Sequence, residues 1–221
     1  MKILLASARP NEVRWASENG LIDGIVTTPA LLALERPDDN GHELLGELCA
    51  IAPGPVHASV ESVTGEDIYR DGKELAKISD RIVVQIPLIE EAVGAIRRLE
   101  AEGVRVTATL IFNAAQAILA ARAGARAVSI GLDRLDASGL DGVEVLRELR
   151  AVFDSDATEC DLRAEYPRDA GHFAACTLAG ADSITVAPSI LRMLLVHPLT
   201  DRGLDDFLND ISRRHTNRSQ S

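Results

Sequence analysis

The sequence is poor in aromatic residues and has no long apolar run. Its 221 residues include one Trp, two Tyr and four Phe, so any interior must be built from aliphatic side chains. Hydrophobic residues still make up 46% of the chain, which is enough for a sizeable core. Ala, Val, Ile and Leu are typical of parallel strands that are buried on both faces.

Cysteines are few and scattered, and no membrane or export signal is visible. Cys49, Cys160 and Cys176 are odd in number and far apart, which argues against a disulfide framework or a zinc site. No stretch approaches the about 18 consecutive apolar residues that a membrane-spanning helix needs. Met1 leads directly into a short strand-like run, without the positive and then apolar regions of a signal peptide. We therefore expect a cytoplasmic protein with no membrane partner.

The chain also lacks the charge pattern of a nucleic-acid-binding protein. Its formal net charge is -11, and no basic patch with interleaved aromatics occurs, so nucleic acid is not an expected partner. A metal centre needs convergent histidines and carboxylates. Among the five histidines only His57 lies in a strand-like run, where an interior hydrogen-bonded role is the simpler interpretation. We expect no metal ion and no cofactor.

Short strand-like runs alternate with helical stretches along the whole chain. The expected strands are residues 2–6, 24–28, 56–61, 81–86, 105–110, 127–131, 157–162 and 183–186. Between them, residues 90–102, 113–122 and 140–153 have helical periodicity, with apolar residues on one face. Gly103, Gly124 and Gly180 follow helices and precede strands, which is the usual position of a helix C-terminal glycine.

Eight strand–helix units predict an α/β fold of the closed (β/α)8 TIM-barrel type over residues 1–199. An open doubly wound sheet is the alternative, but it expects a glycine-rich phosphate loop after the first strand. Ser7, Ala8, Arg9 and Pro10 follow that strand instead. Residues 200–221 form a C-terminal segment, in which an amphipathic helix with Leu204, Phe207, Leu208 and Ile211 precedes a polar tail from His215. This helix could cover its own barrel or a neighbour's.

Five stretches, taken together, carry a resemblance to a known family. Residues 21–30, 81–87, 99–116, 123–136 and 179–186 resemble motifs of the transaldolase family, within it the short fructose-6-phosphate aldolase-like branch. The match runs over nearly the whole chain. It implies a TIM barrel that exchanges C-terminal helices in a homo-oligomer, either a ring of five or a double ring of ten.

The resemblance also implies a reaction, and here the sequence departs from the family. Members form an imine between a barrel lysine and a ketose, but the matching position in this chain is Gln85. An amide nitrogen is not a nucleophile, so Gln85 cannot form the imine. The chain has only three lysines, Lys2, Lys73 and Lys77, and none matches an active-face position. Lysine-dependent class I aldolase chemistry is therefore not expected.

Other family positions are replaced together with the lysine, while some remain. The acidic residue that ends the first strand matches Ala6, and the family's asparagine, water-holding Glu or Gln, tyrosine and Ala-Ser-Phe motif match Thr28, Ser59, Gly131 and residues 162–164. The retained residues include Thr109 on the fifth strand and Arg134, which matches the family's phosphate-binding position.

Strand alternation predicts which side chains meet at the carboxyl ends of the strands. We expect a polar set there, made of Glu61, Gln85, Thr109, Asp133, Arg134, Asp161 and Arg163. Glu61, Asp133 and Asp161 are candidates for acid–base catalysis, with Gln85 and Thr109 donating hydrogen bonds to a carbonyl or oxyanion. Arg134, Arg163, Ser59 and Thr28 are candidates for substrate binding. Arg163 could equally fill the phosphate pocket, and the charged residues could simply form ion pairs that tie the barrel top together.

Three functions are compatible with these residues. The first is a divergent enzyme of lyase, transferase or isomerase type, which uses acid–base chemistry without an imine on a carbonyl compound, phosphorylated or carboxylated, of a specialised pathway. The second is a non-catalytic relative that binds a sugar phosphate. The third is an ordinary transaldolase or aldolase of carbohydrate metabolism.

Overall fold

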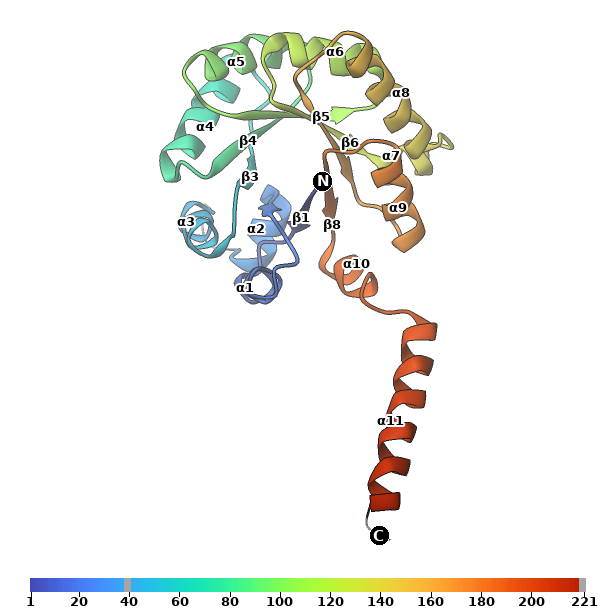
Figure 1. Ribbon diagram of the computed structural model, residues 1–221. Helices are drawn as coiled ribbons and strands as arrows, with labels where there is room; N and C mark the ends of the chain where they lie inside the picture. Colours follow the sequence, from blue (N-terminus) through green and yellow to red (C-terminus); the bar gives the residue numbers. More distant parts are fainter. Residues whose placement is uncertain (38–40, 219–221) are drawn as a thin grey trace.

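A computed structural model describes residues 1–37 and 41–218 and shows a closed barrel of eight parallel strands, joined in chain order from β1 to β8 (Figure 1). The strands are β1 Lys2–Ala6, β2 Gly24–Val26, β3 Val56–Ser59, β4 Ile82–Pro87, β5 Val106–Ile111, β6 Ala127–Gly131, β7 Asp161–Glu165 and β8 Ser183–Val186. The helices are α1 Pro10–Glu18, α2 Pro29–Glu35, α3 His42–Ile51, α4 Gly65–Ile78, α5 Glu90–Ala101, α6 Ala114–Ala123, α7 Leu132–Ala137, α8 Gly142–Ser155, α9 Ala170–Leu178, α10 Pro188–Met193 and α11 Pro198–Arg218.

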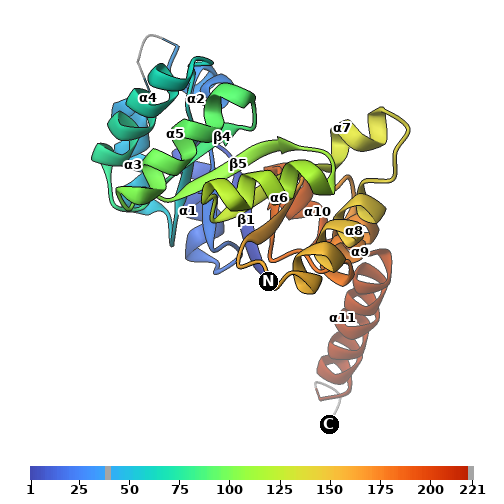
Figure 2. The same ribbon diagram turned by 90° about the horizontal axis from the view of Figure 1, so that it is seen from above.

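The predicted TIM barrel is confirmed, and helices surround the strands (Figure 2). The main core lies between the barrel and this outer layer, and it is aliphatic, as the small number of aromatics requires. Outward-facing strand residues such as Val84, Ala108 and Val128 pack there against helix residues such as Ile96 and Leu99. The burial of these apolar side chains between the outer face of the barrel and the helices is the main stabilising contribution to the fold.

The seventh strand is the predicted strand that is most displaced, while β2 and β3 each end two residues before their predicted ends. The prediction was residues 157–162, whereas β7 spans Asp161–Glu165. The reason is that α8 continues to Ser155, and the chain then needs several residues to leave the helix. Ala157 takes a left-handed conformation with φ 48°, and the Thr158 amide bonds back to the Phe153 carbonyl. The carboxyl end of the strand is therefore Glu165 rather than Leu162.

The inside of the barrel is unusually polar. Six inward-facing side chains, each almost completely enclosed, carry nitrogen or oxygen atoms: His57, Gln85, Thr107, Ser129, Arg163 and Thr185. Strand pairing explains why they meet, since Ser59 is aligned with Gln85, and Arg163 with Ser129 and Ser183. Buried polar groups usually have hydrogen-bond partners. Here His57, Gln85, Thr107 and Arg163 are connected by hydrogen bonds, whereas the hydroxyls of Ser129 and Thr185 have no partner among the described residues.

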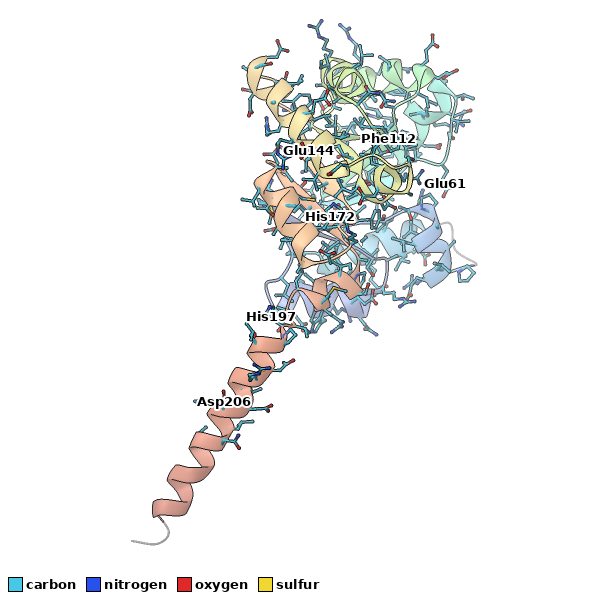
Figure 3. The ribbon with its side chains drawn as sticks, turned by 90° about the vertical axis from the view of Figure 1, so that its right-hand side faces the viewer. Glu61, Phe112, Glu144, His172, His197 and Asp206 are labelled. Carbon is cyan, nitrogen blue, oxygen red and sulfur yellow. The ribbon has the colours of Figure 1, made fainter. Side chains whose placement is uncertain are left out.

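The C-terminal helix α11 leads away from the barrel (Figures 1 and 3). It begins at Pro198, next to His197, and continues to Arg218, so residues 215–218 of the predicted polar tail are helical. Residues 219–221 lie outside the described part of the chain. Leu199, Leu204 and Phe207 are 66%, 54% and 61% exposed. No helix among the described residues has the length and apolar character needed to span a membrane.

Candidate active site

A pocket of about 190 Å³ opens at the carboxyl ends of the strands, where barrel enzymes bind their substrates. Six of the predicted site residues line this upper pocket: Thr28, Ser59, Gln85, Thr109, Asp133 and Arg134. They come from β3, β4 and β5 and from the starts of α2 and α7. Three predicted residues lie elsewhere, and each has an identifiable reason.

Glu61 lies outside the upper pocket. Strand β3 ends at Ser59, so the alternation that would have turned Glu61 inward stops two residues too early. Glu61 lines a separate surface hollow with Asp71 and Glu74 of α4, and Figure 3 shows it at the edge of the barrel. The structure thus does not place this carboxylate among the predicted site residues.

Asp161 lies at the opposite end of the barrel. Because β7 begins rather than ends at this residue, its side chain lines the cavity at the amino ends of the strands. Arg163, two residues further, faces inward but sits deep in the barrel and is 2% exposed. It also lines the lower cavity, and only its contact with Gln85 connects it to the upper pocket.

Glu165 is the pocket residue that the sequence prediction missed. It follows Arg163 by two positions on β7, faces inward and lines the upper pocket. Burial raises the pKa of the Glu165 carboxyl, and the Asp133 carboxylate acts in the same direction against the nearby guanidinium groups of Arg163 and Arg134. A carboxyl group with a raised pKa is suited to take up and release a proton near neutral pH. Correct placement of the end of the strand would have identified it by parity.

The neighbouring Tyr166 is suited to donate a hydrogen bond. Burial raises the pKa of its phenol to about 12, with the Glu165 carboxylate adding to the effect. The hydroxyl therefore stays protonated at neutral pH. Tyr166 lines the upper pocket next to Glu165.

Gln85 is held by hydrogen bonds at both ends of its amide. Its Nε2 donates to the Thr27 carbonyl at 3.2 Å and to Ser59 Oγ at 3.0 Å, and its Oε1 accepts from Arg163 Nη1 at 3.3 Å. Both amide hydrogens are thus already used, so a donation to substrate would require one of these bonds to break. Ser59 accepts from Gln85 and keeps its own hydroxyl hydrogen for a ligand.

None of the three lysines of the chain lines the upper pocket. Lys2 starts β1 and lies at the lower cavity. Lys73 and Lys77 are on α4, where Lys73 pairs with Glu102 at 2.5 Å and Lys77 with Glu74 at 2.6 Å. The upper pocket is thus lined by the Gln85 amide and by no lysine.

Backbone strain gathers at the mouth of the upper pocket. Leu110, with φ 59°, and Tyr166, with φ 58°, are left-handed residues other than glycine, and both line the pocket. The pairing of β5 with β6 shifts register between Ala108 and Ile111, as in a β-bulge. Such conformations cost on the order of 1–3 kcal/mol each and concentrate at functional sites. The strained backbone therefore indicates a functional site here independently of the side chains that line the pocket.

Arg134 offers a positive charge at the pocket mouth. It lies on α7 beside Asp133, and both side chains are exposed. Within the described residues its guanidinium forms no ion pair. Asp136 is different, since it pairs with Arg168 at 2.5 Å and accepts from the Gly142 amide. A purely structural ion-pair role thus fits Asp136, whereas Arg134 is available to bind an anion through two parallel N–H groups.

Thr28 and Thr109 complete the polar wall. The Thr28 side chain caps α2 by accepting from the Leu31 amide at 3.2 Å, which fixes the direction of its hydroxyl. Thr109 lies at the bulge of β5. The described residues contain no group of three or more His, Cys, Asp or Glu side chains that could hold a metal ion.

Comparison with known proteins extends these observations. The model of the family "Transaldolase/Fructose-6-phosphate aldolase" matches residues 7–220. A "Probable transaldolase" of Hyphomonas neptunium is 39% identical over 214 residues, covering 96% of this chain and 98% of that protein. A "Probable transaldolase" of Bartonella tribocorum is 40% identical over 210 residues, covering 95% and 96%.

Solved structures are similar at the level of the fold alone. A designed cube-shaped, highly porous protein cage superposes with a TM-score of 0.64 at 13% identity, over all of this chain and 80% of that one. A structure described as native KDPGal superposes with a TM-score of 0.57 at 17% identity, over 84% and 82% of the two chains.

Proposed function

Since the chain belongs to the transaldolase/fructose-6-phosphate aldolase family, we propose that it is an enzyme of carbohydrate metabolism that acts on the carbonyl group of a phosphorylated sugar. The observation that carries this proposal is that Glu165 and Arg134 line the same small pocket at the carboxyl ends of the strands. One supplies a proton-transferring group, and the other supplies a charge that suits phosphate.

The chemistry we propose is proton transfer without a covalent imine. Glu165 accepts a proton from the substrate, and its raised pKa lets it return that proton at neutral pH. The charge that develops on the carbonyl oxygen is stabilised by hydrogen bonds from Ser59, Thr109 and the Tyr166 phenol. Gln85 is a positioning residue in this scheme, because it holds Ser59 from below.

The same set of groups serves two reactions of one class. If the proton leaves the carbon next to the carbonyl, an enediol forms and the sugar isomerises. If the proton instead leaves the hydroxyl on the β carbon, the bond between the α and β carbons breaks. Its electron pair moves to the carbonyl side, as in a retro-aldol cleavage. Arg134 binds the phosphate in both cases and fixes the register of the sugar.

The test uses fructose 6-phosphate in D2O, followed by NMR. Deuterium exchange next to the carbonyl reports enediol formation, and glyceraldehyde 3-phosphate reports cleavage. We expect one of these signals from the wild type and its loss, by roughly 100-fold or more, in Glu165→Gln. Glu61→Gln is the matched control, since it removes a carboxylate at the same barrel end but outside the pocket. Equal rates in the wild type and Glu165→Gln would overturn the assignment of Glu165.

A second candidate is binding of a sugar phosphate without turnover. It is favoured by the fully bonded Gln85 amide and by the absence of lysine from the pocket walls. Calorimetry discriminates the two, because a binder gives a measurable Kd for fructose 6-phosphate and no product. Arg134→Gln is expected to weaken that binding at least roughly tenfold.

The relatives' names, "Probable transaldolase", support a third candidate, transaldolase activity, which the family resemblance implies proceeds through an imine. Borohydride reduction in the presence of dihydroxyacetone traps an imine as a stable adduct on the intact protein. We expect no increase in protein mass. A covalent adduct would show that a lysine of this chain reaches the substrate, and the imine-free scheme would then be wrong.

A further inference from the structure

A second cavity lies at the amino ends of the strands, opposite the upper pocket. Its volume is about 380 Å³, which is roughly twice that of the upper pocket. Small-molecule sites in proteins commonly have volumes of roughly 300–1,000 Å³. Neither the proposed reaction nor the family resemblance uses this end of the barrel.

The walls of this lower cavity carry more positive than negative charge. The positive side chains are Lys2, Arg105, Arg126 and Arg163, and the negative ones are Glu100 and Asp161. In a chain of net charge -11 this is a local exception. A cleft lined by charges of one sign, with walls of low dielectric constant, focuses their electric field and attracts ions of the opposite sign.

Ion pairing within the protein does not cancel the excess. Glu100 is already paired with Arg126 at 2.7 Å. Arg105 donates to the backbone carbonyls of Asp80 and Ile82, which are neutral and leave its charge uncompensated. Three cations therefore face the cavity against the single remaining carboxylate of Asp161.

Arg163 is the most informative of these residues. It is 2% exposed, and its hydrogen-bonding partners are neutral: Gln85 Oε1 accepts from Nη1 at 3.3 Å, and the two ring nitrogens of His57 lie 3.0 Å from Nη2. The carboxylates of Glu165 and Asp161 act on its charge, but neither forms an ion pair with it in the described part of the chain. The Nε of Arg163 has no hydrogen-bond partner among the described residues. A buried guanidinium that has no directly bonded carboxylate and has an unused donor is costly for the fold.

His57 adds a hydrogen-bonding group but no charge. Burial lowers the pKa of its imidazole well below the ordinary value, with the neighbouring Arg163 acting in the same direction, so the ring is neutral. Burial also lowers the pKa of Arg163, to about 10, so the guanidinium remains charged at neutral pH. The floor of the cavity thus presents one fixed cation supported by a neutral ring.

We propose that the lower cavity is a second ligand site, which binds a small phosphate-bearing anion against Arg163 with Lys2 and Arg105 at its sides. The phosphate supplies a directly bonded anion and an acceptor for the unused Nε–H of the buried guanidinium. Free inorganic phosphate and a phosphorylated metabolite share this chemistry. The remaining volume of the cavity favours the latter.

The test measures binding in a protein whose upper pocket has been disabled. Arg134→Gln removes the cation of the upper pocket and leaves the lower cavity intact. Calorimetry is then performed on this variant with inorganic phosphate and, separately, with fructose 6-phosphate. We expect one site per chain for at least one of the two anions. Binding of phosphate alone identifies the free ion as the ligand, and tighter binding of the sugar phosphate identifies the ester.

Two charge-matched variants in the Arg134→Gln background locate the site. Lys2→Gln removes a cation of the cavity wall, and we expect binding to weaken roughly tenfold. Arg97→Gln removes the same charge from the exposed face of α5, outside the cavity, and should leave the Kd unchanged. Both positions are exposed, so neither change threatens folding.

The outcomes separate this proposal from the proposed function. No binding by the Arg134→Gln protein would overturn the lower site and would leave the role of the upper pocket standing. Equal weakening by Lys2→Gln and Arg97→Gln would mean a general effect of net charge and would overturn it as well. Retained binding together with an inactive wild type would support the lower site alone.

Discussion

At the scale of single residues, Glu165 links the folding of the barrel to pH. Burial raises its pKa, whereas a glutamate in an unfolded chain titrates near about 4.3. Between these two pKa values the folded protein holds a proton that the unfolded chain has lost. Stability therefore falls as the pH rises through this window.

We therefore predict that Glu165→Gln unfolds at a higher temperature than the wild type at pH 7. The advantage should shrink as the pH falls and should vanish well below about pH 4, where both states carry the proton. Thermal unfolding of both proteins over a pH series measures it, with Glu61→Gln as the control for loss of one exposed carboxylate. A Glu165→Gln protein that is less stable than the wild type at pH 7 would contradict the raised pKa.

Gln85 and Arg163 form a second testable pair. Gln85→Lys would restore the residue that the family resemblance expects, but it would place an ammonium next to a buried guanidinium. We expect a loss of roughly 3–5 kcal/mol in the free energy of unfolding, because the new charge is enclosed and faces a like charge. Adding Arg163→Met should recover much of this loss.

Urea denaturation of the single and double variants measures the coupling as a double-mutant cycle. Gln85→Met is the matched control, since it removes the amide bonds without adding a charge. If Gln85→Lys costs no more than Gln85→Met, the guanidinium of Arg163 does not exclude a lysine from this position. The absence of lysine would then need another explanation.

At the scale of elements, the outcome of prediction depended on how each strand ends. The strands β1, β6 and β8 have the predicted bounds, because each is a short run rich in aliphatic residues whose start is marked by a polar residue, Lys2, Arg126 and Asp182 respectively. The predicted position of β7 was wrong because no glycine marks the end of α8. The exit from the helix, at the left-handed Ala157, occupies residues that look like a strand.

That shift of the strand explains most of the errors in the predicted site. The prediction of which alternate residues of β7 face the barrel interior was correct, since Asp161, Arg163 and Glu165 all face inward. Position along the axis was wrong, so Asp161 was expected at the upper end and Glu165 was missed. The alternation of residue types predicts which side chains of a strand face inward. Where the strand begins and ends along the barrel axis depends on the geometry of the preceding loop, which the local sequence does not encode.

The bulge in β5 provides a prediction about backbone strain. Leu110 is left-handed and 41% exposed, so its side chain contributes little to packing. We expect Leu110→Gly to be more stable than Leu110→Ala by about 1 kcal/mol, since only glycine removes the clash of Cβ. At an ordinary strand position the order is the reverse. Chemical denaturation of the two variants measures the difference, and a more stable Leu110→Ala would mean that the left-handed backbone is not strained.

At the scale of the whole molecule, α11 exposes apolar side chains that the barrel does not cover. The helix leads away from the barrel and keeps Leu199, Leu204 and Phe207 more than half exposed (Figure 1). Leu204, Phe207 and Leu208 share one face of the helix, and an exposed apolar face of this kind indicates a surface that another protein surface covers. The resemblance to rings of five or ten subunits that exchange this helix supplies a natural occupant, a second copy of the chain.

We predict that the protein is an oligomer in solution and that α11 holds it together. Phe207→Lys places a charge on the apolar face and should shift the mass measured by light scattering towards the monomer. Asp206→Lys introduces the same side chain one position away, at a residue that is exposed on the helix (Figure 3), and should leave the mass unchanged. Equal masses for the wild type and Phe207→Lys would exclude this face from the interface. If both substitutions dissociate the protein, the effect comes from the added positive charge, and the apolar face of α11 is not the cause of association.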